Sequence, residues 1–259
     1  MAKVTYTNAV NGLSCTFSSD DPMMLLESID GCSCGCDAIT YRPLNLDGQR
    51  FVSSTLTART VVLNVNFGGK AGGKYSRKEA MKRWEEIQRV FVPGNMGTLT
   101  WTDGTESRFI KCRTSETPKP SELLRNKSLF CASFSLTADN PLWFDSVENI
   151  VPLDNVGVTI ENPCGIEVPF IAEVSAGVDA FAMARLEDGA GIALANRINE
   201  DFTIDTAACT VTTASGELVN NQLSVNSSFF GILPGTNRFA VASFGTVTIK
   251  WRKAYMGIF

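Results

Sequence analysis

Three closely spaced cysteines are the residues in this sequence best suited to binding a metal ion. Cys32, Cys34 and Cys36 lie in the run Gly-Cys-Ser-Cys-Gly-Cys, and cysteine thiolates are common zinc ligands. Structural zinc sites, however, usually separate their cysteines by about two to four residues and add a second pair elsewhere in the chain. The single-residue spacing therefore favours a thiol-rich loop, and a bound ion at the three cysteines stays an open alternative.

Two pairs of adjacent carboxylates, Glu187-Asp188 and Glu200-Asp201, suggest acid–base catalysis in a glycosidase. Adjacent residues of a strand point to opposite faces, so neither pair places two carboxylates across one substrate. The sequence has no histidine, which removes the commonest general base and the Ser-His and Cys-His nucleophile pairs. We therefore predict that the protein is not an enzyme, and we assign no catalytic, cofactor-binding or metal-binding residue.

A glycine-rich run at residues 68–73 differs from a phosphate-binding loop in one essential position. A Walker motif needs Gly-x-x-x-x-Gly-Lys followed by Ser or Thr. Here Gly73-Lys74 is followed by Tyr75. We interpret the run as a flexible linker and expect no nucleotide or other cofactor.

Composition indicates an ordinary globular protein, with 44% hydrophobic and 19% charged residues among 259. The first 145 residues carry 17 basic and 15 acidic groups, and the rest carry 6 and 12. This asymmetry suggests two domains but is too small to indicate a nucleic-acid-binding surface. No apolar run approaches the roughly 18 residues of a membrane helix, and no secretion signal opens the sequence. We therefore expect the eight cysteines to be reduced thiols.

Periodicity in the first part of the chain predicts strands and one helix. Ser76-Arg77-Lys78-Glu79 is a capping box, and Ala80, Trp84, Ile87 and Phe91 form one apolar stripe of a helix over residues 76–92. Strands are predicted at residues 23–31, 56–67 and 129–145, with a hairpin at 97–113 that turns at Asp103-Gly104. Residues 31–55 and 114–128 are predicted to be long loops or arms.

The second part of the chain has no helical periodicity of useful length. Short strands separated by Asn, Gly, Asp and Pro turns are typical of an antiparallel sandwich. We predict these strands at residues 166–174, 181–186, 202–207, 218–225, 239–242 and 247–251, with Pro234-Gly235-Thr236-Asn237 as a turn.

Several short motifs resemble the siphophage distal tail (Dit) protein family, and they occur in the family's order. The strand at 129–145 runs into Ala138-Asp139-Asn140-Pro141-Leu142-Trp143, similar to the pattern Ala-Asp-x-Pro-x-Trp/Phe that ends the family's first domain. Residues 162–169 resemble the entry to its second domain, and residues 200–206 resemble its strand Gly-Glu-x-Leu-x-Ile-Asp-Thr, although Asn199 precedes Glu200 here. Residues 229–237 resemble its Pro-Gly-x-Asn turn before the last strand.

The resemblance implies a mainly β fold with two domains. Residues 1–145 would form an α+β, tail-tube-like split barrel or β-sandwich with one helix, which closes a ring. Residues 146–259 would form a galectin-like antiparallel β-sandwich.

The resemblance also implies a structural role at the distal end of the tail of the virion, after synthesis in the host cytoplasm. A homo-hexameric ring would join the tail tube protein to the tail-associated fibre or lysin protein or to the baseplate, and in some phages to receptor-binding proteins. DNA would pass through the channel without sequence-specific binding, and no membrane insertion is expected. The near-neutral first domain is consistent with this passage, since a basic lining would hold phosphate.

A ring needs head-to-tail contacts that close on themselves, and the loops at 31–55 and 114–128 could supply them as arms. An arm that adds a strand to its neighbour gains main-chain hydrogen bonds. We expect deletion of residues 33–50 to prevent ring formation.

The alternative function is a carbohydrate-binding module that recognises the host envelope through the second domain. Sugar sites use exposed aromatic rings together with polar side chains. Phe229, Phe230, Asn237, Arg238 and Trp251 could provide such a set. The competing interpretation is that these are core and turn residues, because large aromatic side chains are mostly buried.

Overall fold

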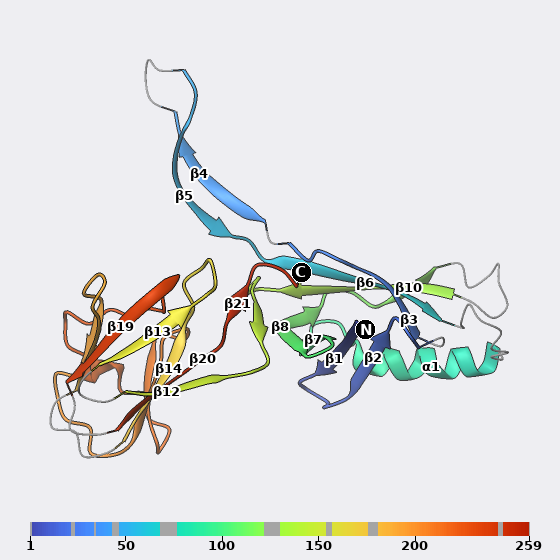
Figure 1. The fold of residues 1–259 in the computed structure, drawn as a ribbon. Helices are drawn as coiled ribbons and strands as arrows, with labels where there is room; N and C mark the ends of the chain where they lie inside the picture. Colours follow the sequence, from blue (N-terminus) through green and yellow to red (C-terminus); the bar gives the residue numbers. More distant parts are fainter. Residues whose placement is uncertain are drawn as a thin grey trace. The chain divides into compact units, whose positions relative to one another are not determined.

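A computed structural model gives the fold of residues 2–21, 24–33, 35–42, 47–67, 77–121, 130–153, 157–175, 181–242 and 246–258 (Figure 1). The chain divides into two compact units. Unit 1 contains Met1–Phe144 and Met256–Phe259, and unit 2 contains Asp145–Tyr255. The last four residues, which we expected in the second domain, therefore group with the first. No helix among the described residues is long and apolar enough to cross a membrane.

Unit 1 is built on a closed barrel of seven strands. They follow one another in the order β8-β7-β1-β2-β3-β6-β10, and pairing of β10 with β8 closes the ring of strands. The seam between β2 and β3 is short, and among the described residues Ser18 and Leu25 form its one pair. The barrel strands are β1 (Lys3–Asn8), β2 (Ser14–Ser18), β3 (Met24–Asp30), β6 (Arg59–Phe67), β7 (Met96–Asp103), β8 (Glu106–Thr114) and β10 (Phe130–Ala138); β9 (Lys119–Ser121) and β11 (Trp143–Asp145) extend the sheet.

The core of unit 1 lies between the barrel strands and the helix α1 (Arg77–Val90). Trp84, Ile87 and Phe91 are buried, as the predicted stripe requires. The Phe91 ring lies 4.5 Å from that of Phe134 in β10, and Trp84 meets Phe67 of β6 edge to face at 5.9 Å. The helix is thereby fixed by its apolar face, which supplies most helix stability in proteins. The side chain of Ala80 and the capping residue Ser76 lie outside the described residues.

The predicted strands of unit 1 are largely confirmed. Val61, Leu63, Val65 and Phe67 alternate as buried residues along β6, and β7 and β8 form the predicted hairpin around Asp103-Gly104. The strand predicted at 23–31 exists as β3, but its side chains are half-buried or exposed rather than buried. The glycine-rich linker at 68–73 lies outside the described residues.

The segment predicted as a loop or arm at 31–55 is a β-hairpin. β4 (Cys36–Tyr41) pairs in antiparallel register with β5 (Arg50–Leu56), and the two strands form a separate sheet (Figure 1). We call β4 and β5 the arm. The loop predicted at 114–128 contains the short strand β9, and residues 122–128 of it lie outside the described residues.

Unit 2 is a sandwich of two antiparallel sheets. One sheet has the order β12-β20-β14-β17-β18, and the other has the order β13-β19-β15-β16. Phe170 of β14 and Phe239 of β19 bring the two sheets into ring contact at 5.8 Å. The strands are β12 (Asn149–Leu153), β13 (Val158–Asn162), β14 (Phe170–Val174), β15 (Ala182–Arg185), β16 (Gly191–Ala193), β17 (Phe202–Asp205), β18 (Thr210–Thr213), β19 (Gly235–Ala242) and β20 (Val247–Trp251). The short strand β21 (Ala254–Tyr255) follows β20 in the chain and belongs to neither sheet of the sandwich.

One strand prediction in unit 2 is wrong. Residues 218–225 hold a 3-10 helix, Asn220–Gln222, between isolated bridges at Leu218 and Leu223. Asn220 explains this local geometry, because its side chain accepts from the Val211 amide at 2.6 Å and donates to the Cys209 carbonyl at 2.9 Å. These bonds hold the backbone in a tight turn instead of an extended strand.

Candidate assembly surfaces

The arm exposes an unusual amount of apolar surface. Every residue of β4 and β5 is exposed, and Ile39, Phe51 and Val52 are each more than half accessible. An isolated two-stranded hairpin is marginally stable in water at best. A hairpin with apolar side chains and free edges is therefore a surface that another chain can cover. The sequence indicated an arm here but gave no strand alternation, because both faces of the hairpin mix apolar and polar residues.

The base of the arm depends on a glycine. Gly31 follows β3 with a φ of 78°, and a Cβ atom built there would lie 1.9 Å from the carbonyl oxygen of Thr60. No side chain fits this approach without a shift of backbone. On the other side of the base, the Thr57 amide donates to the Gly35 carbonyl at 3.1 Å.

The three-cysteine segment lies at the base and the start of the arm. Cys32 is half-buried and its thiol donates to the Ile29 carbonyl, whereas Cys36 opens β4 and is exposed. Burial raises the pKa of Cys32, although the nearby Arg59 opposes this shift. Cys34 lies outside the described residues. Among those described, no three His, Cys, Asp or Glu side chains gather closely enough to hold a metal ion.

A row of polar side chains, which we call the polar face, crosses β3, β6 and β10 on the side away from the core. Asn64 lies at its centre, donating to Ser28 at 2.9 Å and Asp30 at 2.8 Å and accepting from Ser133 at 2.7 Å. Asn66 extends the row by bonding the carboxylate of Glu27 and the thiol of Cys131. The face therefore presents amides and hydroxyls, with the carboxylates of Glu27 and Asp30. Its signal in the sequence is the alternation of Asn64 and Asn66 with buried residues.

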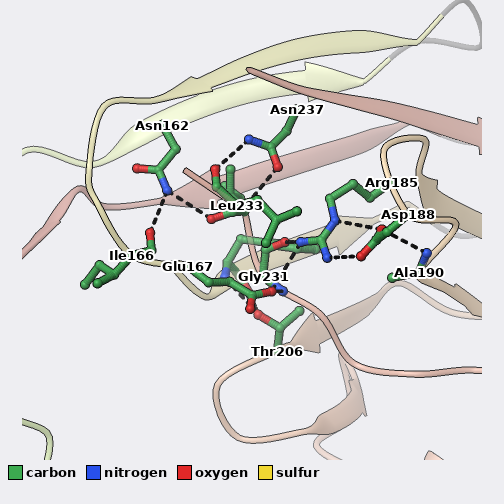
Figure 2. Close-up of polar contacts among 12 residues, drawn as sticks. Asn162, Ile166, Glu167, Arg185, Asp188, Ala190, Thr206, Gly231, Leu233 and Asn237 are labelled. Atoms are coloured by element: carbon green, nitrogen blue, oxygen red, sulfur yellow. Dashed lines mark hydrogen bonds and ion pairs between the residues drawn. The ribbon is translucent and has the colours of Figure 1, made fainter. Parts of the chain in front are cut away.

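Figure 2 shows a polar network in unit 2 around the buried side chain of Arg185. The guanidinium bonds both oxygens of Asp188, at 3.0 and 2.5 Å, and reaches Glu167 at 3.2 Å and the Gly231 carbonyl at 2.5 Å. Glu167 also accepts from the Gly231 amide at 2.7 Å. Arg185 has 4% of its side chain exposed, and it lies 5.3 Å from the ring of Phe230. Arg185 thus ties the chain at 230–231 to β15.

Two buried asparagines hold the same loop at its other end (Figure 2). Asn237 accepts from the Leu233 amide at 2.8 Å and donates to the carbonyls of Leu233 and Gly235 at 2.7 and 2.9 Å. Asn162 donates to the carbonyls of Ile166 and Ile232 at 3.0 and 2.9 Å. The Pro-Gly-x-Asn turn identified in the sequence is therefore a side-chain-locked turn that starts β19.

The residues proposed for sugar binding do not form an exposed aromatic site, and Phe229 is half-buried. Phe230 and Trp251 are 7% and 5% exposed, and Asn237 is fully buried in its turn. Arg238 is exposed but is paired with Glu187 at 3.2 Å. The core-and-turn interpretation explains the burial of Phe230, Asn237 and Trp251. A groove of about 310 Å³ beside β14, β17 and β20 has Glu173, Asp201 and threonine hydroxyls in its lining but no exposed aromatic ring.

The carboxylate pairs bond separate partners. Asp188 binds Arg185, and Glu187 binds the backbone and side chain of Arg238. The hydrogen bond from Arg185 lowers the pKa of Asp188 to about 2. Desolvation pushes the pKa of Glu187 upward, but the bonds from Arg238 outweigh it and lower the pKa. Glu200 accepts from Ser215 at 3.0 and 3.1 Å. A proton donor needs a pKa raised towards neutrality, which is the opposite of what Asp188 and Glu187 show.

Comparison with known proteins supports the resemblance seen in the sequence. Residues 164–255 match the family described as "Siphovirus-type tail component, C-terminal domain". No curated protein matches the chain.

Solved structures share the fold across the whole chain. The Dit protein (gp 19.1) of SPP1, described as a paradigm of the hub adsorption apparatus in phages that infect Gram-positive hosts, is 15% identical with a TM-score of 0.74 over 97% of this chain and 99% of its own. Chains of the phage P2 baseplate in its activated conformation, with Ca and with Sr, give TM-scores of 0.57 and 0.55 at 7% and 8% identity, over the full length of both chains. Residues 164–255 thus match the model of the siphovirus-type tail component family, and the chain as a whole has the mainly β fold seen in a siphophage distal tail protein.

Proposed function

We propose that this protein is a structural hub of a siphophage tail tip that assembles as a homo-hexameric ring. The observation that carries the proposal is the fully exposed arm on a barrel whose fold matches a tail hub protein. A cyclic ring needs a surface on each subunit that fits a different surface on the next, and an arm supplies one half of such a contact. Covering the arm would also remove Ile39, Phe51 and Val52 from water.

The two units would have separate tasks in this ring. Unit 1 would be the tail-tube-like, ring-forming domain, and unit 2 the galectin-like domain at the periphery. The proposed partners are the tail tube protein on one side and the fibre or lysin protein, baseplate or receptor-binding proteins on the other. The protein would act in the virion and have no catalytic role.

The polar face of β3, β6 and β10 is the surface that best suits a DNA channel. The row that its hydrogen bonds define carries amides, hydroxyls and the carboxylates of Glu27 and Asp30. Lys119 of β9 lies opposite Ser133 at the edge of this face, and its charge is paired with Glu116 at 2.6 Å. Non-specific DNA binding is supplied largely by cationic side chains, and a lining with few unpaired cations holds DNA weakly. We therefore place this face towards the channel.

A matched pair of variants tests the arm contact. One replaces Ile39, Phe51 and Val52 of the arm by Ser, and the other replaces Val147, Ile150 and Val225 of unit 2, each of which is also more than half exposed. The arm variant should sediment as a smaller species, because its apolar contact with the neighbouring subunit is lost, and the unit 2 variant should match the parent. Replacing residues 36–56 by a short linker should have the same effect as the arm variant. An arm variant that keeps the oligomeric mass of the parent would contradict the proposal.

A further inference from the structure

The base of the arm contains one buried arginine whose bonds reach two distant parts of the chain. Arg59 is the first residue of β6 and is 3% exposed. Its Nη1 donates to the carbonyl of Cys32 at 3.1 Å, and Cys32 lies in the segment that joins β3 to the arm. Its Nη2 donates to the carbonyl of Met256 at 2.5 Å. Its Nε is buried and has no acceptor among the described residues.

In the described part of the chain, the guanidinium of Arg59 forms hydrogen bonds to backbone carbonyl oxygens alone. No carboxylate there forms an ion pair with it, which separates Arg59 from Arg185 with its two acidic partners. A guanidinium stays protonated, and a buried charge is tolerated only while its hydrogen bonds are made. Loss of one carbonyl therefore leaves the cation poorly bonded in a buried place. The guanidinium then gains most by moving towards water, and this movement also breaks its bond to the other carbonyl.

The segment at residues 256–258 is held in place from two sides. Ile258 is 1% exposed, so its side chain anchors the segment in unit 1. Arg108 of β8 donates to the carbonyl of Gly257 at 3.2 Å, next to the carbonyl that Arg59 binds. Arg108 itself pairs with Glu106 at 3.1 Å. The position of the Met256 carbonyl therefore depends on contacts that lie outside the arm.

We propose that Arg59 couples the base of the arm to the 256–258 segment. While the segment is docked, Arg59 bonds the carbonyls of both Cys32 and Met256. The chain at Cys32, which leads from β3 into the arm, is then fixed beside β6. When the segment is displaced, Arg59 withdraws and the arm becomes free to change direction about Gly31. The docked 256–258 segment thus fixes the direction of the arm through Arg59. This role holds whether or not the protein forms a ring.

Hydrogen exchange of the full-length protein, read by mass spectrometry, tests the coupling. The reporter is the amide of Thr57, which bonds the Gly35 carbonyl across the arm base. Ile258→Ala should undock the segment and raise exchange at Thr57 on the order of tenfold, although residue 258 is not in the arm. Ile87→Ala, an equally buried change in α1 of the same unit, is the control for general loss of stability and should leave Thr57 near the parent rate.

A double-mutant cycle then assigns the coupling to Arg59. Arg59→Lys replaces the fork by a single ammonium, which reaches one carbonyl rather than two. It should raise exchange at Thr57 by itself, and adding Ile258→Ala should then have little further effect. Additive effects of the two changes would overturn the proposal. Equal exchange at Thr57 in Ile258→Ala and Ile87→Ala would overturn it as well, and that comparison stands even if Arg59→Lys fails to fold.

Discussion

At the scale of single residues, Asn237 shows how the Pro-Gly-x-Asn motif acts physically. Its side-chain amide replaces three backbone partners that the turn at 233–235 could not otherwise satisfy. The Pro-Gly pair bends the chain, since Gly235 has a φ of 86°, and Asn237 closes the bend. A sequence motif that could be taken for a binding loop is therefore a structural lock.

Removing that lock should destabilise unit 2. Asn237→Ala leaves the amide and carbonyl of Leu233 and the carbonyl of Gly235 without their partner, which should lower the free energy of unfolding by about 2 kcal/mol. Urea unfolding followed by tryptophan fluorescence measures this change. Asn226→Ala is the control, because Asn226 is exposed and its substitution should shift the free energy by less than about 0.5 kcal/mol. Equal effects of the two substitutions would contradict the assigned role.

The stability of unit 2 should depend on pH through the carboxylate of Asp188. Its pKa is lowered to about 2 by the bond from Arg185, against about 3.9 in an unfolded chain. The stabilisation from its carboxylate is therefore complete above about pH 4 and is lost as the pH falls towards 2. Asp188→Asn should show a smaller drop in urea midpoint than the parent between pH 5 and about pH 2. Identical drops in both proteins would rule out this contribution.

At the scale of elements, the arm depends on Gly31. Gly31→Ala places a methyl group 1.9 Å from the Thr60 carbonyl oxygen and should destabilise unit 1 by more than about 2 kcal/mol. Gly12→Ala is a matched control, because Gly12 also has a positive φ, 70° against 78°, but its Cβ would meet no atom within 4 Å. Thermal unfolding of both variants separates the clash from the strain of the backbone. Gly31→Ala should unfold at a lower temperature than Gly12→Ala, and equal unfolding temperatures would contradict the assigned clash.

Sequence patterns predicted the elements that have one buried face. The helix α1 and the strand β6 were found because Trp84 and Ile87, or Val61 and Leu63, repeat at the spacing of one apolar side. The arm strands were not found, since both of their faces are exposed and no periodicity is imposed on them. The 3-10 turn at Asn220–Gln222 was missed because its cause, the contacts of Asn220 with Val211 and Cys209, is a tertiary one.

The candidate surfaces were predicted less completely than the fold. The sequence located the arm between residues 31 and 55 but not its apolar residues, which follow no pattern. The sugar-binding set failed because Phe230 and Trp251 belong to the sandwich core, and no local signal distinguishes a buried aromatic ring from an exposed one. The link between Arg59 and Met256 joins residues 197 positions apart in the chain, so only the folded structure reveals it.

At the scale of the whole molecule, the chain combines a barrel that carries the arm with a sandwich that contains the turn locked by Asn237. Both units occur in a fold shared with a tail hub protein over 97% of the chain. At 15% identity, this likeness shows the fold and leaves assembly to be measured. The exposed arm and the polar face of β3, β6 and β10 are the two surfaces that we propose for assembly, the arm for contact between subunits and the polar face for the lining of a channel.

Mass in solution tests the central claim most directly. Light scattering on a size-exclusion column, at two protein concentrations and under reducing conditions, gives the mass of the assembly independently of its shape. The account predicts a particle of six 28.1-kDa chains, or of two such rings stacked. A 28.1-kDa monomer at both concentrations, with the arm intact, would contradict the proposed ring.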